Sequence, residues 1–221
     1  MNVGESLPSI TVLALSILIG YLLGALPFAD LISRRYGVDI FSVGTGLAGT
    51  SNVRRSVGRK PAIAVMLGDI GKGALAVVVS RYLGVTGVWA LLPAIAAILG
   101  HWKSVFSGFR GGDGNAILGG ILIALFAWFG VMAVLIAILV SAGGQRLPYS
   151  SLLNIIAGYL TIAALTISFN SDLPLALGAG GLCALVLARA IYGHIKRRPA
   201  GNWEEEFEES DGTPEPPPLN P

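Results

Sequence analysis

The stretch ITVLALSILIGYLLGALPFADLI, residues 10–32, contains one charged residue in 23 positions, and a run of this length can cross the hydrocarbon core of a bilayer as a helix. The chain is 53% hydrophobic and 13% charged, with a mean hydropathy of +0.71, which leaves too little polar surface to coat a soluble globule. The sequence therefore predicts an all-α, polytopic membrane helix bundle. Further apolar runs follow at residues 62–83, 85–100, 116–142, 149–169 and 173–191.

The placement of lysine and arginine predicts the topology of this bundle. Three polar segments carry the basic residues: Arg34 to Lys60 after the first run, then Lys103 to Arg110, then Lys196 to Arg198. All three lie inside if the run at 116–142 is two helices divided near Gly130. We therefore expect about seven transmembrane helices, with the N-terminus outside and the C-terminus in the cytoplasm. The N-terminal run lacks a basic n-region and a cleavage site, so we interpret it as a retained span.

Two regions differ sharply in composition. Residues 1–200 are expected to form one transmembrane domain, and residues 201–221 an acidic, proline-rich tail too polar to fold alone. The net charge of +2 therefore conceals a basic body. The basic residues of that body are typical of a protein surface beside the anionic headgroups of the cytoplasmic leaflet, or alternatively of one that attracts anionic substrates. The acidic tail suggests a protein partner. The only cysteine, Cys183, excludes disulfides within the chain and Cys-based metal sites.

The first inside loop has the composition of a phosphate site. It reads GTGLAGTSNVRR from Gly44 to Arg55. Glycines let backbone N–H groups converge on an anion, hydroxyl and amide groups add donors, and arginine offers a two-pronged contact to phosphate oxygens. Thr50 stands where a Walker loop needs lysine, so we set nucleotide triphosphates aside. An ordinary glycine-rich membrane-protein turn is the alternative.

A second polar cluster follows on the same side of the membrane. The segment GHWKSVFSGFRGGDGN, Gly100 to Asn115, again joins glycines to basic and polar groups, and the two loops can face each other. Between them, Asp69 and Lys72 share one helix face inside an apolar run, where charges are usually paired or functional. His101 is a candidate general base or, alternatively, a structural residue at the membrane interface.

Taken together, these residues resemble the bacterial acyl-phosphate:glycerol-3-phosphate acyltransferases, the PlsY family. The order, spacing and topology of several short motifs agree, mostly in the first half of the chain. The matching positions are Gly24 to Phe28, Gly37 to Ile40, Val43 to Gly46, Gly49, Asn52, Val53, Arg55, Gly58, Asp69, Lys72, Gly73, Gly100, His101, Val105, Phe106, Phe109, Gly111, Gly112 and Gly114.

The resemblance implies a membrane enzyme that transfers an acyl chain from acyl phosphate to glycerol 3-phosphate in phospholipid synthesis. Lysophosphatidic acid and inorganic phosphate are the implied products, with no metal, coenzyme or nucleic acid. The enzyme would lie in a bacterial cell membrane with its active site facing the cytoplasm. His101, Thr45 and Asn52 are the implied catalytic residues. The phosphate-binding set is Gly44, Gly46, Ser51, Arg55, Lys72, Arg110, Gly111, Gly112 and Arg197.

Several positions depart from the family pattern in the expected site. Asp113 stands where the family has lysine, and Ile191 and His194 stand where it has histidine and asparagine. An alternative is therefore a catalytically degenerate member that binds an anionic lipid or metabolite, or serves as a membrane subunit. A transporter, suggested by the intramembrane pair of Asp69 and Lys72, is a third possibility.

Overall fold

The computed structural model describes residues 7–143 and 150–197, the side chains of 150–151 and 194–197 excepted. Helices dominate this part of the chain, which contains no β-strand beyond a two-residue bridge between Ser104 and Arg110. The predicted acidic tail lies outside the described residues. The helices are α1 (Ile10–Gly24), α2 (Phe28–Arg35), α3 (Thr50–Ser56), α4 (Arg59–Tyr82), η1 (Gly87–Ala90), α5 (Leu91–Trp102), η2 (Val105–Ser107), α6 (Asn115–Phe126), α7 (Trp128–Gly143), α8 (Ser150–Ser168) and α9 (Leu173–Arg197).

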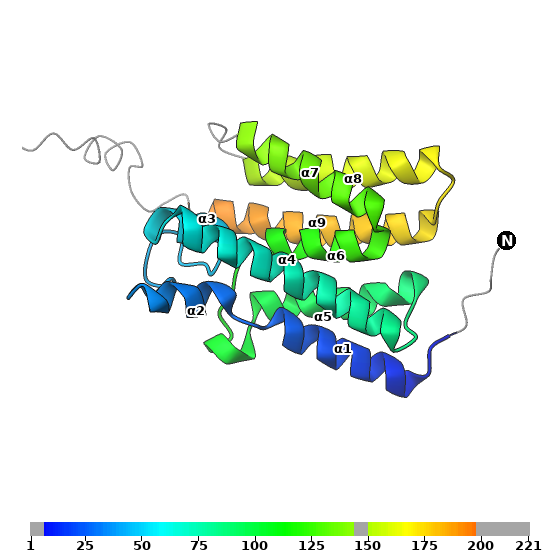
Figure 1. Cartoon of the computed structure of the whole chain (residues 1–221), viewed down its shortest axis with the longest axis horizontal. Coiled ribbons are helices and arrows are strands. Elements are labelled where there is room, and N and C mark those ends of the chain that lie inside the picture. Colours follow the sequence, from blue (N-terminus) through cyan, green and yellow to red (C-terminus); the bar gives the residue numbers. More distant parts are fainter. Residues whose placement is uncertain (1–6, 144–149, 198–221) are drawn as a thin grey trace, which may run out of the picture.

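The long helices lie side by side in a bundle, and the short helices α2 and α3 gather at one end of it (Figure 1). Helix α4 packs against both α1 and α6, and α1 also packs against α5. Helices α7 and α8 form a pair that joins the rest through α6 and α9. The all-helical architecture predicted from the sequence is confirmed.

Glycines permit the closest helix contacts, as expected where lipid offers no hydrophobic drive between helices. A Cβ atom on Gly24 would overlap the Ala97 carbonyl, which places the α1 and α5 backbones in contact. A Cβ atom on Gly120 would overlap the Ile70 carbonyl, which places the α6 and α4 backbones in contact. Helix α4, which packs against α1, α2, α3, α5 and α6, is the central helix of the half that carries the glycine loops.

The apolar run at 116–142 is two helices divided near Gly130, as predicted, and the break itself lies at Ala127. Ala127 has a φ of 48°, a left-handed value that interrupts the helix. The Arg81 guanidinium donates to the carbonyls of Ala124 and Leu125 at 2.6 and 3.1 Å. Carbonyls at the end of α6 therefore find a donor inside the apolar bundle.

The first apolar run is also interrupted, whereas the sequence predicts one continuous span. Helix α1 ends at Gly24, and α2 begins at Phe28, directly after Pro27. The residue before a proline is disfavoured in a helix, so Leu26 breaks the run. Ser104 Oγ donates to the Ala25 carbonyl at 2.5 Å and Lys72 Nζ to the Leu26 carbonyl at 2.8 Å, so both freed carbonyls are paired.

Three helical stretches among the described residues are long and apolar enough to cross a membrane. They are Ile10–Arg35, Arg59–Tyr82 and Leu173–Gly193. Four shorter apolar stretches accompany them: Gly87–Trp102, Asn115–Phe126, Trp128–Gly143 and Leu152–Ser168. The chain is thus built as a membrane protein.

Substitution of Gly120 by alanine should destabilise the bundle, because the new methyl group would overlap the Ile70 carbonyl. Overpacking of this kind typically costs about 1–3 kcal/mol. Gly181→Ala on α9 is the matched control, since its methyl group meets no atom within 4 Å and alanine favours helix. Thermal unfolding in detergent should show a lower midpoint for Gly120→Ala only. Equal midpoints for the two variants would contradict the close contact of α4 and α6.

Candidate active site

Asn52 organises the first glycine loop. Its side chain is buried, and its amide nitrogen lies 3.0–3.1 Å from the carbonyl oxygens of Ile40, Val43 and Leu47. Its amide oxygen accepts the backbone N–H of Thr45 at 3.2 Å. One side chain therefore holds the loop closed around itself. Asn52 was predicted to be catalytic, and its position suits a residue that shapes the loop.

Residues 50–56 form helix α3, although the sequence predicts a loop there. Three of its side chains, Thr50, Ser51 and Arg54, line a large cleft. The Thr50 hydroxyl is buried and has no hydrogen-bond partner among the described residues. Arg55 is exposed and lies outside this cleft.

The cleft has a polar mouth and an apolar interior. It encloses about 440 Å³ between α3, α4, α6, α7 and α8. Arg54, Arg59, Asp113, Asn115 and Asn154 contribute charged or polar groups at the mouth, while Leu118, Leu122, Ala133 and Ala137 line the interior. Asp69, whose carboxylate is paired with Lys72, also lines the cleft. An amphiphile with an anionic head and an aliphatic chain matches this division.

The two glycine loops meet, as the sequence predicted. The Ala48 N–H donates to the Gly111 carbonyl at 3.2 Å. A Cβ atom on Gly111 would overlap the His101 carbonyl, and one on Gly112 would lie 2.5 Å from both the Ala48 carbonyl oxygen and His101 Nε2. Only glycine fits in this gap, so the second loop can cross close to both the first loop and the histidine.

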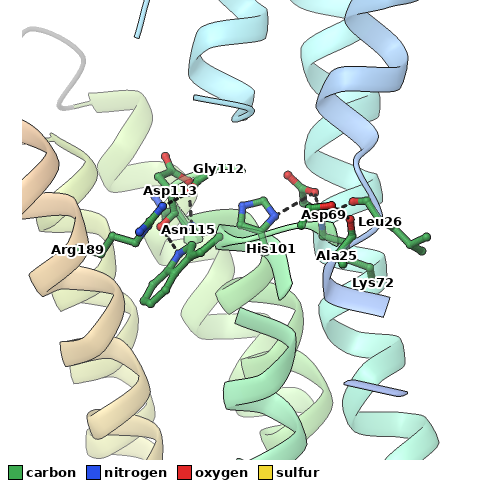
Figure 2. A network of polar contacts seen from close by, with 11 residues as sticks. Ala25, Leu26, Asp69, Lys72, His101, Gly112, Asp113, Asn115 and Arg189 are labelled. Carbon is green, nitrogen blue, oxygen red and sulfur yellow. Dashed lines mark hydrogen bonds and ion pairs between the residues drawn. The ribbon is translucent and has the colours of Figure 1, made fainter. Parts of the chain in front are cut away.

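His101 lies between Asp69 and the segment of Gly112 and Asp113 (Figure 2). It is buried at the end of α5, with Nδ1 3.8 Å from Asp69 Oδ1. Asp69 and Lys72 form the ion pair expected from their spacing, at 2.8 Å and almost fully buried. Lys72 is thus engaged by a carboxylate and by the Leu26 carbonyl.

A small cavity of about 10 Å³, room for about one water molecule, lies beside this histidine. It brings together residues predicted from the sequence to bind phosphate or act in catalysis. They are Lys72, His101, Arg110, Gly111 and Gly112. Arg110 itself is exposed and stacks on the Phe41 ring, its guanidinium carbon 4.2 Å from the ring centre.

Asp113 lies two residues before helix α6, at the mouth of the cleft. Its carboxylate accepts the Asn115 N–H at 3.1 Å and faces Gly49 of the first loop. Its carbonyl accepts the indole N–H of Trp102 at 3.0 Å. Asp113 therefore faces the site, although its carboxylate also holds the local backbone.

Two side chains from the second half of the chain reach this region. Asn154 on α8 accepts a hydrogen bond from the Asn115 amide at 3.2 Å. Arg189 on α9 stacks on Trp102 at 4.7 Å and approaches the Gly112 carbonyl at 3.5 Å (Figure 2). Neither residue was predicted from the sequence. An isolated asparagine in an apolar run was the available signal for Asn154.

The remaining predicted residues divide into two groups. Gly44, Thr45 and Gly46 lie in the first loop but line neither cavity, and the two glycines have positive φ values of 54° and 65° that suit glycine. The side chains of His194 and Arg197 lie outside the described part of the structure. Within that part, no group of three or more His, Cys, Asp or Glu residues is placed to hold a metal ion.

Comparison with known proteins assigns this arrangement to a family. The model of the family described as glycerol-3-phosphate acyltransferase matches residues 14–199. The chain belongs to this family. Its fold matches the crystal structure of PlsY, an integral membrane glycerol 3-phosphate acyltransferase, in the glycerol 3-phosphate form. That match has a TM-score of 0.69 and 24% identity and covers 89% of this chain and 98% of the other.

Curated family members show closer sequence similarity. The glycerol-3-phosphate acyltransferase of Coxiella burnetii is 36% identical over 155 residues, which cover 69% of this chain and 80% of that protein. Glycerol-3-phosphate acyltransferase 1 of Deinococcus radiodurans is 44% identical over 124 residues, 56% of this chain and 63% of the relative. The Geobacter metallireducens protein is 44% identical over 105 residues, which cover 54% of that protein. The chain therefore spans less than two thirds of the length of the Deinococcus and Geobacter relatives.

Substitution of Asn52 by aspartate should open the first loop of this family member. The aspartate would place a carboxylate oxygen where the amide nitrogen now donates to three carbonyl oxygens. Each buried group left without a hydrogen bond costs about 1–3 kcal/mol of stability. We expect faster tryptic cleavage after Arg54 and Arg55 and a lower unfolding temperature. Ser56→Ala, which loses only a 3.4 Å contact to Asn52, is the control. Cleavage of Asn52→Asp no faster than that of the control would rule out this role.

Proposed function

We propose that this chain transfers an acyl group from an acyl phosphate to glycerol 3-phosphate, giving lysophosphatidic acid and inorganic phosphate. The observation that carries the proposal is the cleft, with arginines and hydroxyl groups at its mouth and aliphatic side chains inside. Membership of the glycerol-3-phosphate acyltransferase family supports the same reaction. The related PlsY crystal structures are described as glycerol 3-phosphate and lysophosphatidic acid forms, which fits the proposed substrate and product.

In this proposal the acyl phosphate occupies the cleft. Arg54, Arg59 and Ser51 bind its phosphate, and the unpaired Thr50 hydroxyl adds a donor. The aliphatic chain lies along α4 and α6. Glycerol 3-phosphate binds beside the paired glycine loops, where Arg55, Arg110 and the backbone of Gly111 and Gly112 supply cations and donors.

The reaction balances without a further reactant. The 1-hydroxyl oxygen of glycerol 3-phosphate forms the new ester bond to the acyl carbon, and the bond from that carbon to the phosphate oxygen breaks. The hydroxyl proton passes to an oxygen of the departing phosphate. Because acyl phosphate is already activated, positioning two anions supplies much of the acceleration. His101, anchored beside Asp69, orients the acceptor, and Thr45 helps to hold the loop that faces it.

We also propose seven membrane crossings, formed by the three long helical stretches and the four shorter apolar ones. With the N-terminus outside, the basic segments Arg34 to Lys60 and Lys103 to Arg110 lie in the cytoplasm. The active site then faces the cytoplasm of a bacterial cell. Residues 1–200 form the membrane domain, and the acidic tail at 201–221 is available to a protein partner.

The test is release of inorganic phosphate by the purified protein given palmitoyl phosphate, with and without glycerol 3-phosphate. Arg54→Ala should lower kcat/KM for palmitoyl phosphate at least about tenfold, since hydrogen bonds to charged groups contribute about 1.5–3 kcal/mol. Arg55→Ala should raise the KM for glycerol 3-phosphate. Arg35→Ala, an exposed arginine on α2 away from the cleft, is the control. Phosphate release that does not require glycerol 3-phosphate would count against acyl transfer.

Asp113 separates an adapted enzyme from a degenerate family member. Because its carboxylate accepts the Asn115 N–H, Asp113→Asn keeps an acceptor there, whereas Asp113→Lys removes it. We expect near-normal activity for the asparagine variant and at least a tenfold loss for the lysine variant, about 1.4 kcal/mol. The measurement is steady-state kinetics with both substrates. Tighter glycerol 3-phosphate binding by Asp113→Lys would instead indicate a degenerate member.

A further inference from the structure

The apolar part of the cleft ends where α6 meets α7. Leu122 and Ala133 line the cleft at this depth and are 5% and 0% exposed. A Cβ atom on Gly130 would overlap the Leu122 carbonyl, so the two backbones touch directly beyond this point. The contact leaves no room for a ligand to pass, and Leu122 and Ala133 form the floor of the cleft.

Small residues create the space above the floor. Gly119, Ala137 and Gly158 line the cleft on α6, α7 and α8. A Cβ atom on Gly119 would lie 3.4 Å from Val134, so even a methyl group there would tighten the passage. The space therefore depends on side-chain size at a few positions.

The depth of this apolar section can be measured along the helices. Asn115, at the polar mouth, and Leu122, at the floor, are seven residues apart on α6 and thus about 10 Å apart along its axis. An extended chain advances about 1.2 Å per bond, so about eight bonds reach the floor. Ile63 and Ile138 also line the cleft and are each 44% exposed, so the end of a longer acyl chain can leave the cleft toward lipid on this side.

We propose that the floor at Leu122 and Ala133, together with Ala137 above it, determines which acyl-chain lengths the enzyme accepts. The inference rests on the proposed acyl transfer. Acyl chains that end above the floor lie wholly within the cleft. Longer acyl chains must bend out of the cleft between α4 and α7. A larger side chain at position 137 raises the obstruction by about 6 Å, the rise of four residues on α7.

The experiment compares octanoyl, decanoyl, lauroyl and palmitoyl phosphate as donors to glycerol 3-phosphate. Ala137→Leu should raise the ratio of kcat/KM for palmitoyl over octanoyl phosphate about tenfold, the scale expected from overpacking, because the octanoyl chain loses its space above the floor whereas the palmitoyl chain already bends out of the cleft. Leu122→Ala, or Leu122→Val if the alanine variant fails to fold, deepens the cleft and should raise kcat/KM for decanoyl relative to octanoyl phosphate. The matched control is Ala164→Leu on α8, because Ala164 is exposed and lies outside the cleft.

The outcomes separate this inference from the proposed function. An unchanged chain-length profile for Ala137→Leu, in a variant that still transfers acyl groups, would overturn the inference alone. A wild-type protein that transfers no acyl chain of any length would overturn the proposed function and the inference with it. A profile that shifts equally for Ala137→Leu and Ala164→Leu would also overturn the inference, since it would show that the cleft is not responsible.

Discussion

Carbonyl groups left unpaired where helices break are the constraint on which this structure depends. In a bilayer such groups cannot turn to water, so the protein must supply a donor for each. Here side chains do so. Lys72 and Ser104 donate to the carbonyls at the break between α1 and α2, and Arg81 donates to a carbonyl at the end of α6. In the same way, the Asn52 amide donates to three carbonyls of the first loop.

This pairing allows irregular backbone to exist inside the bundle, and the irregular backbone forms the site. The two glycine loops touch through Ala48 and Gly111, and His101 lies against them. Because Asp69 pairs with Lys72 and lies beside His101, helix α4 connects the break in the first helix to the histidine. Catalysis by positioning needs this kind of rigidity more than it needs unusual chemistry.

The sequence predicted the features that follow from periodicity and composition. The apolar runs, the pairing of Asp69 with Lys72, the division of residues 116–142 and the meeting of the two loops all agree with the structure. Local exceptions were harder to predict. Helix α3 was missed because Thr50, Ser51 and Asn52 have weak helix propensity, and the break at Ala127 depends on Arg81, which is 46 residues away in the sequence.

The cleft was missed for a related reason. Its lining comes from α3, α4, α6, α7 and α8, and the residues that form its space are glycines and alanines with no chemical signal of their own. Asn154 and Arg189 approach the site only because α8 and α9 fold back on the first half of the chain. Such positions depend on tertiary packing, which one sequence does not reveal.

The donors at the first helix break also impose an order on biogenesis. The carbonyls of Ala25 and Leu26 emerge from the ribosome well before their partners, Lys72 and Ser104, have been synthesised. Until then the N-terminal segment lacks the groups that stabilise its bend. The break between α1 and α2 therefore reaches its final shape only after α5 has been made, so this segment matures later than helices that follow it in the chain.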